Sequence, residues 1–183
     1  SYMNLVLTQT GHLEQAYALL HQTQWPSWLY AVTQGATTIW ERWDGWTHDK
    51  GFQNPSMNSF NHYAYGAIGE WMYATVAGID LDEAQPGYKH IIFHPQPGGK
   101  LTSAKAHLHS MHGLISSAWS LKNSAFDWKI EVPANTTATV YVPCAAGQKV
   151  TSTPAADGVT FLREENDTQI YEVVSGTYHF QAE

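Results

Sequence analysis

The sequence has little charge and almost no cysteine. Its 183 residues include 9 Lys and Arg against 16 Asp and Glu, a formal net charge of −7, so it lacks the basic excess that binds nucleic acid or anionic membranes. Its one cysteine, Cys144, excludes an intrachain disulfide and a zinc site made of cysteines alone. No apolar run approaches the roughly 20 residues that a membrane-spanning helix needs. Neither nucleic acid nor a membrane is therefore expected as a partner.

The first residues also lack the pattern of a signal peptide, which is a charged stretch followed by an apolar one. The opening residues, Ser1-Tyr2-Met3-Asn4, suit an internal position in a longer chain as well as a processed terminus. The sequence therefore leaves the location of the protein open.

Aromatic residues, by contrast, are abundant. The 8 Trp, 10 Tyr and 6 Phe make up 13% of the chain. Most of the tryptophans lie early, and only Trp119 and Trp128 lie beyond Trp71. This uneven distribution indicates that the first and last parts of the chain differ in structure.

The first part predicts three helices. An amphipathic helix is expected within residues 11–20, where apolar residues recur at helical spacing: Leu13, Ala16, Tyr17 and Leu20. A second helix is expected from Pro26 to Gly35, since proline favours the first turn and glycine the position after the last. A third is expected to have Ser59 as its N-cap and to end at Gly78. The long loop between the second and third helices, residues 36–58, is of a length that is usually functional.

The second part predicts strands. Residues 79–89 are rich in acidic residues, Pro and Gly and indicate a linker. Apolar and polar residues then alternate from Phe126 to Val132, a turn is expected at 133–135, and alternation resumes over 138–142. Further short strands are expected near 158–163, 169–174 and 177–181. The expected fold is α plus β, with a helical part over 1–80, a linker over 81–88 and an antiparallel β-sandwich over 89–183.

The long loop contains a carboxylate between tryptophans, in the segment Trp40-Glu41-Arg42-Trp43-Asp44-Gly45-Trp46. Apolar neighbours raise the pKa of a carboxyl group, while a nearby arginine lowers it. Indole faces stack on the apolar C–H faces of sugars, so acidic residues among tryptophans suggest a carbohydrate cleft. The alternative is that the tryptophans pack in the core and that both carboxylates, Glu41 and Asp44, are simply solvated.

Two further segments contain side chains that bind ligands in other proteins. Asn61 and His62 are expected at the start of the third helix, where exposed N–H groups and the helix dipole favour polar ligands. The alternative is a capping asparagine and a surface histidine. A second group, His107, His109 and His112, invites a metal interpretation, but no carboxylate or cysteine stands at a known ligand spacing, so no metal and no cofactor are expected.

Several motifs resemble one family in order and spacing. They are Pro26-Ser27-Trp28, the string GATTIWERWDGW over 35–46, the string MNSFNHYAYG over 57–66, and Ala77-Gly78-Ile79. Together they resemble the C-terminal part of the bacterial and fungal α-L-rhamnosidases of glycoside hydrolase family seventy-eight. The resemblance covers residues 25 to about 95 well, and the β part fits the C-terminal sandwich domain of the family by position.

The resemblance implies a fold and a set of roles. The helices would be the last ones of an (α/α)6 barrel. Glu41 would be the general base of an inverting hydrolysis, and His62 would contact the bound rhamnose. Asn61 would lie beside it, and the tryptophans of the loop would line the pocket: Trp40, Trp43 and Trp46. The expected partner is a rhamnose-containing glycoside or polysaccharide.

The resemblance also implies that something is missing. An inverting glycosidase needs a second carboxyl group, the general acid, roughly 6.5–9.5 Å from the base. In the family this acid lies on earlier barrel segments, and the only carboxylate in residues 1–34 is Glu14. The chain alone is therefore expected to be inactive, and its uncovered helices are expected to self-associate or repack. The alternative is a non-catalytic carbohydrate-binding or structural piece.

Overall fold

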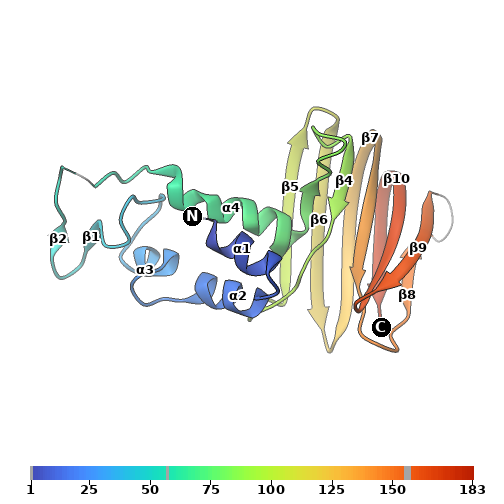
Figure 1. The fold of residues 1–183 in the computed structure, drawn as a ribbon, viewed down its shortest axis with the longest axis horizontal. Helices are drawn as coiled ribbons and strands as arrows, with labels where there is room; N and C mark the ends of the chain where they lie inside the picture. Colours follow the sequence, from blue (N-terminus) through green and yellow to red (C-terminus); the bar gives the residue numbers. More distant parts are fainter. Residues whose placement is uncertain (1, 57, 155–157) are drawn as a thin grey trace. The chain divides into compact units, whose positions relative to one another are not determined.

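The computed structural model describes residues 2–56, 58–154 and 158–183 (Figure 1). The chain forms two compact units, Ser1–Trp71 and Met72–Glu183. The first unit contains short helices and the second a large β-sheet, which confirms the α plus β class. No helix among the described residues is long and apolar enough to cross a membrane. Met57, which opens one of the motifs, lies outside the described residues.

Short helices and one small hairpin make up the first unit. The elements are α1 (Met3–Gln9), α2 (Leu13–His21), α3 (Trp28–Thr33), β1 (Trp46–Thr47), β2 (Gly51–Phe52), the 3-10 helix η1 (Tyr63–Ala67) and α4 (Ile68–Trp71). The core of the unit is centred on Tyr17 and Trp71, which are both fully buried. Their rings pack edge to face with centroids 5.0 Å apart. The Trp71 indole N–H donates to the Thr8 hydroxyl at 2.8 Å and so ties α4 to α1. The predicted amphipathic helix is confirmed as α2.

The starts of the other two predicted helices were placed wrongly. Helix α3 begins at Trp28 and not at Pro26. Its N-cap is Ser27, whose hydroxyl accepts the Tyr30 N–H at 3.0 Å. Ser59 does not cap the third helix, because that helix starts at Tyr63 and the Ser59 hydroxyl accepts the N–H of Asn61, which lies before the helix. That helix begins at η1 instead, with His62 as the N-cap.

The second unit begins with a π-helix and continues with strands. The elements are η2 (Met72–Ala77), β3 (Ile79–Leu81), β4 (His90–Phe93), β5 (Ser103–Ser110), β6 (Gly113–Lys122), β7 (Ala125–Pro143), β8 (Val150–Thr153), β9 (Val159–Glu165) and β10 (Thr168–Ala182). Strand β3 lies in the segment expected as a linker, so that prediction is wrong for residues 79–81. The reason is that β3 pairs with β4 in the sheet.

Two long strands, β7 and β10, pair along most of their lengths and run through both halves of the sheet (Figure 1). The first half of β7 pairs with β6, and its second half pairs in parallel with β4. Likewise β10 pairs first with β9 and then with β8. Asn135, at φ 59°, bends β7 where a turn was predicted, and the register between β7 and β10 shifts between Val174 and Gly176. The predicted turn is therefore a bend within one strand, and the sandwich is antiparallel except for the β4–β7 pair.

The bend folds the two halves of the sheet over a shared aromatic core. Phe93 of β4 contacts Trp128 of β7 edge to face at 6.2 Å, and both side chains are fully buried. Tyr171 and Phe180 belong to the two ends of β10, yet their ring centroids lie 5.4 Å apart. These contacts join the two layers of the predicted β-sandwich.

Candidate functional site

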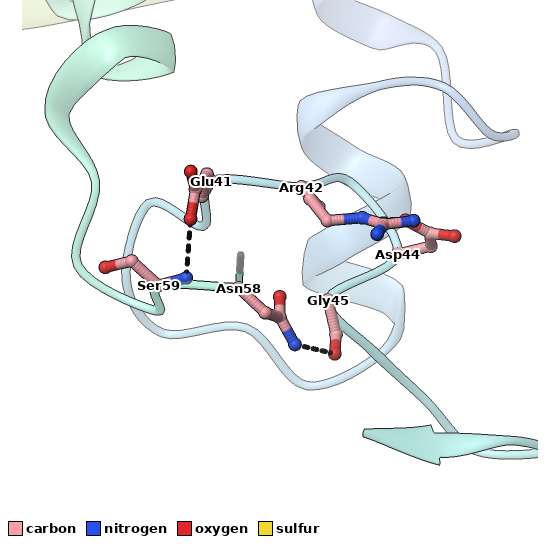
Figure 2. A network of polar contacts seen from close by, with 6 residues as sticks. All are labelled: Glu41, Arg42, Asp44, Gly45, Asn58 and Ser59. Carbon is pink, nitrogen blue, oxygen red and sulfur yellow. Dashed lines mark hydrogen bonds and ion pairs between the residues drawn. The ribbon is translucent and has the colours of Figure 1, made fainter. Parts of the chain in front are cut away.

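Two hydrogen bonds join Glu41 and Ser59, and Figure 2 shows the one to the Glu41 carboxylate. The Glu41 N–H donates to the Ser59 carbonyl at 2.9 Å, and the Ser59 N–H donates to Glu41 Oε2 at 2.8 Å. Among the residues that the structure describes, Oε1 of the same carboxylate has no hydrogen-bond partner. The carboxylate is thus held by one oxygen, and the other oxygen is free to accept a proton from water.

The same pairing continues toward His62. Its N–H donates to the Ile39 carbonyl at 2.9 Å, and the Thr38 hydroxyl donates to the Phe60 carbonyl. Residues 38–41 and 59–62 therefore run side by side in opposite directions. This arrangement brings the two predicted site segments together, although they are separated by the long loop in sequence.

Asn61 and His62 line an open hollow of about 350 Å³ together with Thr38, Ile39 and Tyr63. The Asn61 side chain is exposed, and the backbone N–H of the same residue donates to the Ser59 hydroxyl at 3.2 Å. The His62 Nδ1 accepts the Ala64 N–H at 3.4 Å, which leaves Nε2 for a ligand. The hollow therefore presents an amide and an imidazole, both of which can bond a sugar hydroxyl.

The three predicted tryptophans lie in different surroundings. Trp40 is only 8% exposed and packs edge to face on Phe60. Trp46 lies in β1, and its ring packs edge to face on that of His48 in the turn after this strand. Trp40 and Trp43 line a second, smaller hollow of about 70 Å³, which shares Thr38 and Ile39 with the first. The structure thus places Trp40 and Trp43 beside the hollow of Asn61 and His62, and it places Trp46 in neither lining.

Comparison with protein families decides what the site belongs to. The model of the bacterial α-L-rhamnosidase 6-hairpin glycosidase domain matches residues 1–76, and that of the bacterial α-L-rhamnosidase C-terminal domain matches residues 78–156. The chain belongs to the bacterial α-L-rhamnosidase family. This confirms the family predicted from the motifs.

Individual relatives agree with the family. An α-L-rhamnosidase of Streptomyces avermitilis is 48% identical over 175 residues, which cover 96% of this chain and 16% of the relative. One of Formosa agariphila is 42% identical over 181 residues, covering 97% of this chain and 19% of the relative. The crystal structure of the Streptomyces avermitilis enzyme complexed with L-rhamnose matches at a TM-score of 0.89 with 46% identity, over 98% of this chain and 17% of that one. The chain spans less than a fifth of the length of these rhamnosidases.

His107 and His109 stand on one face of β5, exposed, with ring centroids 5.9 Å apart. No group of three or more His, Cys, Asp or Glu side chains able to hold a metal ion occurs in residues 2–56, 58–154 and 158–183.

The structure adds contacts that the sequence did not predict. Ser59, predicted only as a helix cap, holds Glu41 through its backbone, and a backbone contact leaves no signal in the sequence. Asn58 donates from Nδ2 to the Gly45 carbonyl at 2.8 Å and fixes the far end of the same loop (Figure 2). Arg42 and Asp44 form an ion pair at 3.4 Å that is partly exposed and so adds little stability.

Proposed function

We propose that this chain forms the base-bearing part of a longer α-L-rhamnosidase, which releases α-L-rhamnose from glycosides with inversion of configuration. Glu41 is the general base, and Asn61 and His62 bind the sugar. Trp40 and Trp43, which line the adjoining hollow, form the aromatic wall of the pocket, whereas Trp46 lines neither hollow and is not assigned to this wall. The observation that carries the proposal is the Glu41 carboxylate, held at Oε2 by the Ser59 N–H and unbonded at Oε1 within the described residues.

This arrangement suits a base for a physical reason. A general base must stay ionised and must present a lone pair to the attacking water within hydrogen-bond reach. The bond to Oε2 fixes the direction of Oε1 without occupying it. The pairing of residues 38–41 with 59–62 holds the chain segments of Glu41 and His62 next to each other, so the water and the sugar would be bound from adjacent segments.

The rest of the enzyme is proposed to supply what this chain lacks. The general acid would come from earlier helices of an (α/α)6 barrel, of which residues 1–80 form the end, followed by the linker 81–88 and the sandwich domain 89–183. The chain alone is then inactive. Tyr2, Met3 and Val6 are at least half exposed on and beside α1, and we expect them to drive self-association in its absence.

The base is tested in a longer protein that carries this sequence. Glu41→Gln should abolish the release of nitrophenol from an aryl α-L-rhamnoside. Glu41→Ala should be equally inactive, but azide should restore turnover and yield the β-rhamnosyl azide, because the anion enters the space of the base and attacks from its face. NMR of the first sugar released by the unchanged enzyme should show the β-anomer. Full activity of the glutamine variant would exclude Glu41 as the base.

The chain alone is tested for sugar binding. Calorimetric titration with L-rhamnose should give weak binding that His62→Ala removes, with no turnover of the aryl rhamnoside. Binding without loss in His62→Ala would move the sugar away from this hollow. Absence of any binding would favour a purely structural piece.

Self-association of the chain alone is tested by sedimentation. The Val6→Lys variant is compared with the unchanged chain, and the added charge should weaken the association.

A further inference from the structure

The loop that carries Glu41 is held at both ends by two consecutive residues of a distant segment (Figure 2). Ser59 binds Glu41 at the start of the loop, and Asn58 binds the Gly45 carbonyl at its end. Between them, the Gly45 N–H donates to the Arg42 carbonyl at 3.1 Å and closes a turn. The loop from Glu41 to Gly45 is thus a short, closed unit attached at two points.

The two attachments differ in their contact with water. Ser59 is exposed, so water competes for the bond that holds the Glu41 carboxylate. The bond from Asn58 is partly buried, and the Oδ1 atom of the same side chain is completely buried. Water therefore competes less for the Asn58 bond than for the bond to the Glu41 carboxylate.

The packing around Asn58 is tight. A Cβ atom added at Gly45 would lie 2.6 Å from Asn58 Oδ1 and 3.4 Å from the Phe60 ring. Glycine is required here by this close approach and not by a positive φ, since Gly45 is not among the residues with positive φ. The loop end and the Asn58 amide therefore fix each other's position.

The Asn58 side chain is kept in place although it is only half satisfied. Its Oδ1 is buried with no hydrogen-bond partner among the described residues. Such an atom lowers stability, because it loses its water and gains no protein donor. What the asparagine supplies in return is the Nδ2 donor to Gly45, a group that aspartate, serine or an apolar side chain does not provide in the same form.

We infer that Asn58 is a positioning residue that holds the Glu41 carboxylate in the orientation needed to activate water. This rests on the proposed function, in which Glu41 is the base. Asn58 is not among the residues that line the hollow of Asn61 and His62; it acts through Gly45 and the turn at Arg42. The hollow of Asn61 and His62 is held by a separate bond, from His62 to Ile39. Loss of Asn58 should therefore disturb the chemical step and leave sugar binding largely intact.

The experiment uses a longer protein that carries this sequence. Asn58→Ala should lower kcat roughly 10- to 100-fold, the effect expected of a misplaced catalytic group, with KM for an aryl rhamnoside changed less than about 2-fold. Asn54→Ala is the matched control: Asn54 precedes Asn58 in the segment 36–58, is exposed, and its Oδ1 accepts the N–H and the hydroxyl of Ser56. It should leave both constants unchanged. An Asn58→Ala enzyme with unchanged kcat would overturn the inference.

A second variant distinguishes the positioning role from a simple loss of folding. Asn58→Asp keeps the shape but replaces the donor by an oxygen that can donate to Gly45 only when protonated. Its activity relative to the unchanged enzyme should therefore rise as the pH falls, whereas a merely structural defect gives a constant ratio and would contradict the inference. Gly45→Ala should lower kcat similarly, and its effect should not add to that of Asn58→Ala.

The two levels of the proposal fail separately. If azide does not rescue Glu41→Ala and Glu41→Gln stays active, the proposed base is wrong whatever Asn58 does. If Glu41 behaves as the base and the Asn58 variants match the unchanged enzyme, only the positioning role is wrong. Azide should not rescue Asn58→Ala, because the Glu41 carboxylate still occupies its place.

Discussion

Trp43 and Tyr65 stack face to face, with ring centroids 3.8 Å apart and planes 19° from parallel. Trp28 meets Trp43 edge to face at 5.2 Å, and its indole N–H donates to the Tyr65 carbonyl at 2.8 Å. These three rings join α3, the Glu41 loop and η1 within the first unit. One face of Trp43 is thereby covered by protein, so this tryptophan has only part of its surface left for a sugar.

Trp43→Ala should therefore destabilise the first unit. We expect a loss of about 3 kcal/mol in the free energy of unfolding, at the lower end of the range for buried aromatics because Trp43 is partly exposed. Urea unfolding followed by far-UV circular dichroism measures it. Trp25→Ala is the control, since Trp25 is 60% exposed, and it should change the midpoint little. Equal midpoints for the two variants would contradict the packing role of Trp43.

Ser117 should be the most sensitive serine of β6. Its side chain is fully buried, and its hydroxyl donates to the Ala77 carbonyl at 2.6 Å and accepts the Trp128 indole N–H at 2.9 Å. Ser117→Ala leaves both partners buried and unpaired, at about 1–3 kcal/mol each. Chemical denaturation should show this loss, whereas Ser120→Ala, at an exposed position of the same strand, should stay within about 0.5 kcal/mol of the unchanged chain. A neutral Ser117→Ala would mean that water replaces the hydroxyl.

Gly78 should tolerate no side chain. It has φ 74°, and an added Cβ would lie 2.2 Å from the Pro95 nitrogen, closer than any real contact. Gly147 also has a positive φ, 88°, but an added Cβ there meets nothing within 4 Å. Gly147→Ala therefore measures backbone strain alone, about 1–2 kcal/mol. Thermal unfolding should show Gly78→Ala losing clearly more, and equal losses would remove the clash as the cause.

The stability of the second unit should fall in mild acid because of His94. Burial lowers the pKa of this imidazole below its usual 6.5, and the nearby Asp80 opposes the shift in part. The unfolded chain then binds a proton more readily than the folded one, so stability is complete above about pH 6.5 and falls as the pH drops from there toward the folded pKa. Denaturation midpoints between about pH 7 and pH 5 should show this slope.

His94→Gln should flatten the slope, whereas His109→Gln, at an exposed position of β5, should leave it unchanged. A slope that persists in full without His94 would assign the acid sensitivity to another group.

Local pattern predicted some elements well and others poorly, for physical reasons. Helix α2 and the alternation in β7 were found because their buried faces are apolar. Helix α1 was missed because its buried residue is polar: Asn4 is 2% exposed and donates to the Ala16 carbonyl, while Met3 and Val6 face outward. The sequence predicts a turn where the structure has the bend at Asn135. The reason is that a Pro-Ala-Asn sequence does not show whether the chain reverses into a new strand or continues as the same strand.

The candidate site, like the fold, could be predicted from the sequence only in part. Glu41 and His62 were singled out by their motifs, but the contacts that bring them together run through backbone groups of Ser59 and Ile39, which any residue carries. Asn58 left no pattern either, because its proposed role depends on Gly45, which lies 13 residues away in the sequence.

The threading of β7 and β10 through both layers has a consequence for how the sandwich opens. Both layers contain parts of β7 and β10. Separating one layer from the other would therefore break hydrogen bonds in both. The amide protons of β6 and of β4 lie in different layers but are paired to the same strand. They should therefore exchange with deuterium at a common, slow rate set by global unfolding, with no layer acting as an independently melting segment.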